Sequence, residues 1–124
     1  MKIEFFTDRD AVHNVRFLGD SYASNEFILG VFYDCYSIKH LQDSIEDIDK
    51  VLKGELDNYE LGDGVDIELD GNYTILRADF VKSKVYKIKT IDLKEALEKW
   101  VLFQQKEESK ISKTISIKSD VLLD

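Results

Sequence analysis

The spacing of apolar residues changes along the chain, and this change constrains the fold more than any other feature of the sequence. Between residues 38 and 52 the apolar positions recur at intervals of three and four, which predicts the buried stripe of an amphipathic helix. Between residues 65 and 69 they alternate with acidic residues, which is the period of a half-buried strand. Both periods occur within 124 residues, so we expect helices and strands in one domain spanning residues 1–124.

The first helix is expected to span residues 37–53. Its apolar stripe consists of Ile38, Leu41, Ile45, Ile48 and Leu52. Ser37 is a suitable N-cap, because its side-chain oxygen can accept hydrogen bonds from the free N–H groups of the first turn. Gly54 is a suitable stop. Asp43, Glu46, Asp47 and Lys50 fall opposite the stripe, so three carboxylates are expected to share the exposed face.

Strands are predicted before this helix from short runs of aromatic and β-branched residues. Residues 3–6 and 12–17 are candidates. Residues 26–36 are the most apolar run of the chain and are typical of a central strand that is covered on both faces.

A three-stranded meander is predicted after the helix, over residues 65–69, 73–80 and 85–90. The sequence Asp70-Gly71-Asn72 indicates its first turn, because these residue types tolerate positive φ. A turn with two central residues would place Ile67, Leu69, Thr74 and Leu76 on one face. A turn with three would move Tyr73, Ile75 and Arg77 to that face instead, and the sequence leaves both registers open.

A second amphipathic helix is expected to start at Thr90 or Asp92, either of which can cap it, and to run to about residue 108. Its broad apolar face consists of Leu93, Ala96, Leu97, Trp100, Val101 and Phe103. Residues 111–117 are consistent with a last strand, and the alternative is that residues 106–124 form a loosely held basic tail. The element order predicts an α+β fold, with two amphipathic helices on one face of a mainly antiparallel sheet.

The negative charge is concentrated in one part of the chain. The formal net charge is −8, yet residues 43–70 alone carry eleven acidic and two basic residues, a net charge of −9. An acidic chain is a poor ligand for the phosphate backbone, so direct nucleic-acid binding is not expected. No apolar run approaches the length of a membrane span, and Glu4 interrupts any secretory signal, so we expect a cytoplasmic protein without membrane contact. The single cysteine agrees with a reducing compartment.

Catalytic and metal-binding motifs are weak in this sequence. His13, His40 and Cys35 have no spacing typical of a metal site or of a catalytic pair, and we expect Cys35 to be a buried structural residue. The pattern Asp66-x-Glu68-x-Asp70-Gly71 copies half of a calcium loop, but Arg77 stands where the loop requires a bidentate glutamate. Strand alternation explains these acids instead. We therefore expect a binding protein with no cofactor or metal and without enzymatic activity.

The remaining acids suggest a surface for a basic partner. Those without an evident structural reason lie on the first helix and in the predicted loop over residues 55–64. With one aromatic residue, Tyr59, they form the candidate binding surface: Asp43, Glu46, Asp47, Asp49, Glu55, Asp57, Tyr59, Glu60 and Asp63. An exposed tyrosine among acids is typical of an interface hot spot, although Tyr59 could equally tuck its ring under the loop. Opposite charge would speed association with a basic protein.

The meander and second helix also resemble a known class of proteins. The stretch Gly62-Asp63-Gly64-Val65-Asp66-Ile67-Glu68-Leu69-Asp70-Gly71-Asn72-Tyr73, then residues 85–88, then residues 93–103 with Leu93, Leu97 and Trp100, looks like the small immunity proteins of bacterial contact-dependent growth inhibition and related polymorphic toxin systems. The resemblance covers residues 60–104 and implies a cognate toxin domain, commonly a nuclease or tRNase, that is bound and neutralised. It transfers no site residue. The alternative is a cytosolic adapter or regulator for another basic partner.

Overall fold

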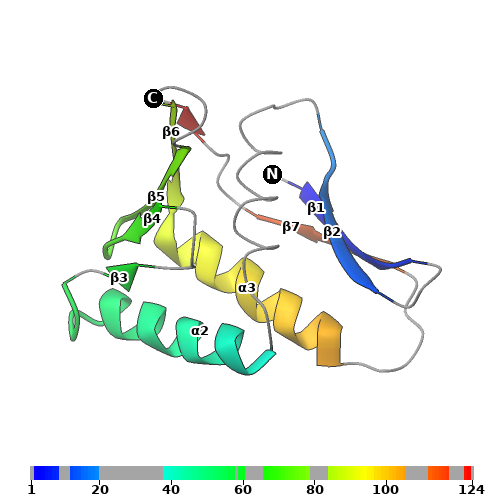
Figure 1. Ribbon diagram of the computed structural model, residues 1–124, viewed down its shortest axis with the longest axis horizontal. Coiled ribbons are helices and arrows are strands. Elements are labelled where there is room, and N and C mark those ends of the chain that lie inside the picture. The colour runs from blue at the N-terminus through cyan, green and yellow to red at the C-terminus, as the bar shows by residue number, and fades with distance from the viewer. Residues whose placement is uncertain are drawn as a thin grey trace.

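The computed structural model describes residues 2–8, 12–19, 38–57, 59–60, 66–78, 84–105, 112–117 and 122–123 (Figure 1). The elements are β1 (Lys2–Thr7), β2 (His13–Phe17), α2 (Ile38–Leu52), β3 (Tyr59–Glu60), β4 (Asp66–Leu69), β5 (Tyr73–Ala78), β6 (Lys84–Lys89), α3 (Thr90–Gln105), β7 (Ser112–Ser116) and β8 (Leu122–Leu123). The α+β class, both helices and the two N-terminal strands are confirmed. The strand predicted over residues 26–36 lies outside the described residues, as does Cys35.

The first sheet joins the two N-terminal strands to a strand that follows α3. Its order is β2-β1-β7, with both pairings antiparallel. The last-strand interpretation is therefore right for residues 112–116 and the tail interpretation is wrong there, because Ile115 pairs with Ile3 of β1. Ile3, Phe5, Val15 and Ile115 are buried, which gives this sheet one apolar face.

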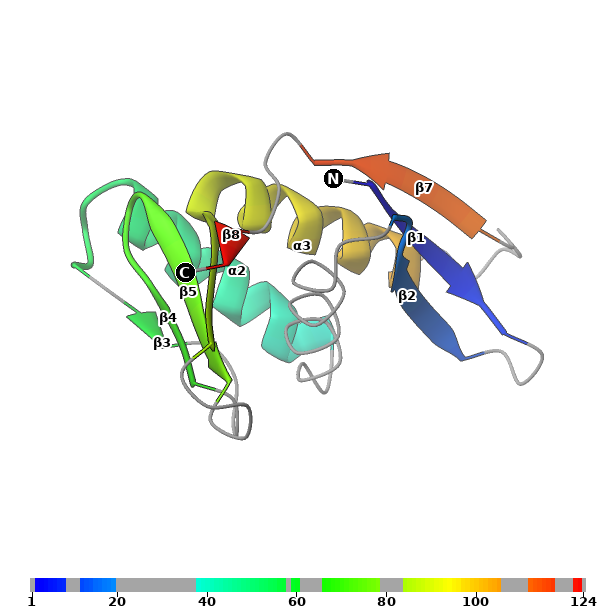
Figure 2. The ribbon, with the colours of Figure 1, turned by 90° about the horizontal axis from the view of Figure 1, so that it is seen from above.

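The second sheet contains the predicted meander. Its order is β3-β4-β5-β6-β8, and every pairing is antiparallel. We expected one sheet, but the described strands divide between two. The physical reason is the long-range pairing of β1 with β7, which builds a sheet apart from the meander. Figures 1 and 2 show the two sheets at opposite ends of the helix pair, with α3 extending from one to the other.

The first turn of the meander has two central residues, Gly71 and Asn72, because Leu69 pairs with Thr74. Ile67, Leu69 and Thr74 are accordingly buried, whereas Tyr73 is exposed. Our reason for the turn was wrong at Gly71, since Gly54 is the one described glycine with positive φ. The Asp70 carboxylate holds the turn instead: its Oδ1 accepts from the backbone N–H of Asn72 at 2.7 Å and of Tyr73 at 2.8 Å.

The core is built around α3. All six residues of its predicted apolar face are buried. At its C-terminal half the ring of Phe5, from β1, lies 5.0 Å from the ring of Trp100 and 5.7 Å from that of Phe103, measured between centroids. At its N-terminal end, the buried hydroxyls of Thr90 and Thr74 are 3.2 Å apart, which joins α3 to β5. Among the described residues, no helix has the length and apolarity to cross a membrane.

Candidate binding surface

The predicted acids on α2 divide into two groups. Asp43 and Glu46 are exposed on the side away from the buried residues Leu41, Ser44 and Ile48. Asp47 lies at the edge of this face, with its side chain 36% exposed and its carboxylate 3.9 Å from the Lys50 ammonium. Within the described part of the chain, Asp43 and Glu46 make no ion pair, so these two carboxylates are open to a partner.

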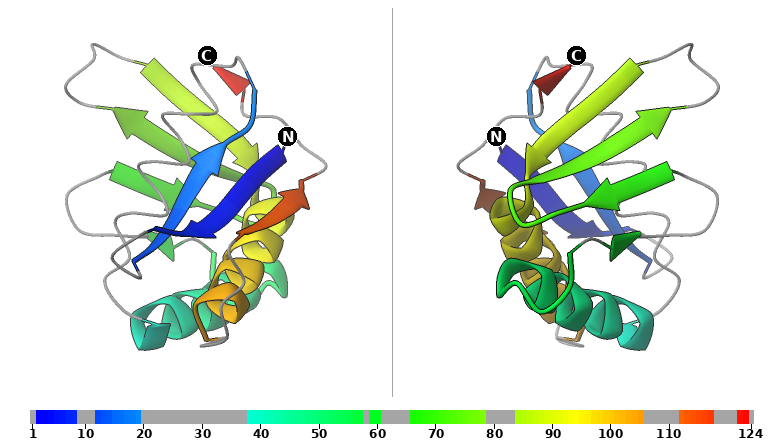
Figure 3. Two further views of the ribbon diagram at one scale, coloured as in Figure 1. Left: turned by 90° about the vertical axis from the view of Figure 1, so that its right-hand side faces the viewer. Right: turned by 90° about the vertical axis from the view of Figure 1, so that its left-hand side faces the viewer.

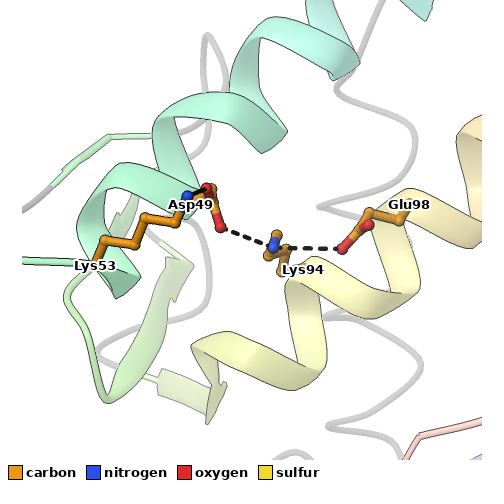
Figure 4. Close-up of polar contacts among 4 residues, drawn as sticks. All are labelled: Asp49, Lys53, Lys94 and Glu98. Atoms are coloured by element: carbon orange, nitrogen blue, oxygen red, sulfur yellow. Dashed lines mark hydrogen bonds and ion pairs between the residues drawn. The ribbon is translucent and has the colours of Figure 1, made fainter.

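Asp49 has a structural function, which corrects our view that its charge lacked one. Its two carboxylate oxygens lie 2.7 Å from Lys53 Nζ and 2.9 Å from Lys94 Nζ (Figure 4). Lys94 belongs to α3 and lies 3.8 Å from Glu98, so alternating charges connect the two helices. The hydrogen bonds from Lys53 and Lys94 lower the pKa of Asp49 below its ordinary value. Asp49 therefore helps to hold α2 against α3.

The segment after α2 is positioned by a Schellman motif. The Gly54 N–H donates to the Val51 carbonyl at 3.1 Å, and the Glu55 N–H donates to the Lys50 carbonyl at 2.8 Å. Gly54 has φ of 79°, the left-handed region that this cap requires, and so the predicted stop is confirmed. Glu55 and Asp57, which follow, are exposed and make no ion pair among the described residues. They add two open carboxylates at the C-terminal end of α2.

The predicted loop over residues 55–64 is wrong at Tyr59 and Glu60. These residues form β3, in which Tyr59 pairs with Leu69 and Glu60 pairs with Glu68. Two residues are too few for periodicity to show in sequence, and the acidic composition favoured a loop. Asp63 lies outside the described residues, so the structure places eight of the nine predicted site residues and brings them to α2, its C-terminal extension and the neighbouring sheet edge.

The two described histidines lie on different elements. His13, in β2, lies 3.1 Å from Thr7 Oγ1 through its Nδ1 and packs edge-on against Phe103, whereas His40 is exposed on α2. Among the residues that the structure describes, no group of three or more His, Cys, Asp or Glu side chains could hold a metal ion. The two backbone hydrogen bonds to Asp70 lower its pKa, which assigns that carboxylate to the hairpin turn.

One polar junction, between α3 and the β4–β5 turn, was not predicted from the sequence. Thr90 is buried, its hydroxyl donates to the Asp70 carbonyl at 2.8 Å, and its N–H donates to the Asn72 carbonyl at 3.1 Å. We assigned Thr90 only a capping role. The sequence signal for this junction was the position of Thr90 directly between a predicted strand and a predicted helix. Thr74 added to this signal, because it falls on the inward face of its strand.

Comparisons with protein-family models, with curated proteins and with solved structures found no match to this chain. Its function is therefore inferred from its own residues and their geometry.

Proposed function

We propose that this chain is an immunity protein, which binds a basic toxin domain through the acidic surface of α2 and its C-terminal extension and thereby neutralises it. The observation that carries the proposal is the exposure of four carboxylates that pair with no cation in the described part of the chain. They are Asp43, Glu46, Glu55 and Asp57. Like charges on one surface repel one another and lower stability. Binding to a basic partner would explain why the chain carries them.

The chemistry of the partner follows from the sign of the charge. Nuclease and tRNase domains hold phosphate groups and are therefore basic around their active sites. Carboxylates on a preformed helix can occupy such a site in place of phosphates. Charge complementarity also raises the association rate by orders of magnitude at low ionic strength, which suits an inhibitor that has to act before its target does damage. Binding without catalysis is sufficient for this function.

Co-expression with the product of the adjacent gene tests the proposal. The expected result is rescue of growth when that product is toxic, together with a stoichiometric complex of the purified proteins that has no nuclease activity. A complex in which the toxin keeps its activity would instead favour the adapter alternative. Absence of a complex with a basic, toxic neighbour would contradict the proposal.

A further inference from the structure

Three segments distant in sequence meet at one end of the molecule, which we call the turn end: residues 54–57, 70–73 and 90–92. Figure 3 shows them together in its right-hand view, where the C-terminus of α2, the β4–β5 turn and the N-terminus of α3 face the viewer. The hydrogen bonds from Thr90 to Asp70 and Asn72 join two of them. The third is adjacent, because a Cβ at Gly71 would lie 3.7 Å from the Val51 carbonyl oxygen.

The turn end exposes apolar side chains from all three segments. The described residues include six exposed large hydrophobic side chains, and three of them are here: Leu56 (37% exposed), Tyr73 (36%) and Ile91 (62%). Single exposed hydrophobic residues are ordinary on a protein surface. Three on segments that lie together at one end are the kind of apolar surface that protein partners bind.

These side chains are carried by well-fixed backbone. Ile91 follows Thr90, whose N–H and hydroxyl are both hydrogen-bonded, and the Leu56 N–H donates to the Lys50 carbonyl at 3.3 Å. The Lys87 ammonium lies 5.0 Å from the centroid of the Tyr73 ring. A surface that is ordered before binding loses less conformational entropy in a complex.

The charges beside these residues differ in sign from side to side. Glu55 and Asp57 are exposed on the α2 side, where Lys53 is already paired with Asp49. On the β6 side, Lys89 is exposed and the Lys87 ammonium lies over the Tyr73 ring. Basic residues of a partner would therefore lie over the end of α2, and its apolar side chain would lie over Ile91 and Tyr73.

We infer that the turn end is the anchoring part of the interface, and that it binds a basic segment of a protein partner which inserts an apolar side chain between its lysine and arginine residues. This inference rests on the proposed function and deepens it. Asp43 and Glu46 lie toward the N-terminal end of α2 and would attract the partner. The apolar residues of the turn end would slow its dissociation, as the residues at the centre of an interface do.

The test uses a defined probe: a short peptide of lysine and arginine with one central phenylalanine, titrated to millimolar concentration into the isotope-labelled full chain and followed by amide NMR shifts. A matched peptide carries serine in place of phenylalanine. We expect saturable shifts at residues 54–57, 70–73 and 90–92 with the first peptide and weaker ones with the second. Saturable shifts that leave out the turn end, no saturable shifts, or equal binding of both peptides would overturn the inference.

A pair of variants on α3 provides the control. Ile91→Ala removes an exposed side chain at the turn end, and Leu102→Ala removes one that is 52% exposed near the other end of the same helix. We expect Ile91→Ala to weaken binding of the phenylalanine peptide about tenfold, the effect of losing a hot-spot contact. Leu102→Ala is expected to leave it unchanged, and equal effects would overturn the inference.

Two further results separate the possible occupants. Concentration-dependent shifts at the same amides without peptide would identify a second copy of this chain as the occupant and overturn the inference. The peptide test does not depend on any toxin. If the peptide binds at the turn end but co-expression does not rescue growth, only the proposed function is refuted. If co-expression rescues growth but the peptide does not bind there, only the anchoring role of the turn end is refuted.

Discussion

Asp49 shows how one residue can have a different function from its neighbours of the same charge. Asp43, Glu46 and Asp49 lie within two turns of one helix, yet only Asp49 reaches a cation on another element. The turn of 100° per residue directs Asp49 toward α3, whereas Asp43 and Glu46 face solvent. Sequence periodicity could place all three outside the apolar stripe. It could not show which flank of α2 would meet Lys94, because that depends on how the helices pack.

The first prediction concerns Asp49→Asn. Because the pKa of Asp49 is lower in the folded chain than in the unfolded chain, its ion pairs stabilise the fold above about pH 4. That contribution is lost as pH falls through the lower, folded-state pKa. Asp49→Asn should therefore lower the Tm at neutral pH and reduce the drop in stability on acidification below about pH 4. Thermal denaturation across that range measures both effects, with Asp43→Asn, which removes an unpaired carboxylate from the same helix, as the control that should not lower the Tm.

A second prediction at this scale compares two glycines. Gly54 has positive φ, and no atom lies within 4 Å of the position that a Cβ would take, so the cost of Gly54→Ala comes from the backbone alone. It should destabilise the fold by about 1–2 kcal/mol. Gly71→Ala meets only an ordinary contact with the Val51 carbonyl and should change stability by less than about 0.5 kcal/mol. Urea denaturation would contradict this explanation if both substitutions had the same effect.

At the scale of elements, the long periodic segments could be predicted from sequence and the short ones could not. The stripe of α2 and the apolar face of α3 extend over four turns, so their bounds were predicted to within a few residues. The two-residue strands β3 and β8 have no period of their own and form because a neighbouring strand offers free backbone groups. The division into two sheets depends on long-range pairing of β1 with β7, which no local pattern encodes.

The third prediction concerns the contact of α3 with the first sheet. Trp100 packs against Phe5 and stacks on Phe103, with 6.1 Å between the ring centroids of Trp100 and Phe103, so Trp100→Ala removes a large buried ring from this aromatic cluster. The free energy of unfolding should fall by about 3–5 kcal/mol. Leu102→Ala, on the exposed face of the same helix, should change it by less than about 0.5 kcal/mol. Chemical denaturation distinguishes them, and a small effect of Trp100→Ala would contradict α3 as the centre of the core.

At the scale of the whole molecule, fewer acids are open to a partner than the sequence suggests. The stretch of net charge −9 includes Asp49, which is neutralised by lysines, and Asp70, which is bound to the hairpin backbone. The candidate site was therefore predictable as a region, because exposed acids on a helix face follow from periodicity. The residues that make up the site could not be predicted, because only the contacts between elements show which carboxylates are open and which have a structural function.

The central claim is that the open carboxylates of α2 bind a basic toxin, and association kinetics test it most directly. The double variant Asp43→Asn/Glu46→Gln is compared with Glu95→Gln/Glu98→Gln, which removes the same charge from α3, where Glu95 and Glu98 already pair with lysines. With the toxic product of the adjacent gene, the first variant should associate about three- to tenfold more slowly at low salt and show a weaker salt dependence. The second should associate nearly as the unmodified chain does. Equal slowing by both variants, or by neither, would contradict the claim.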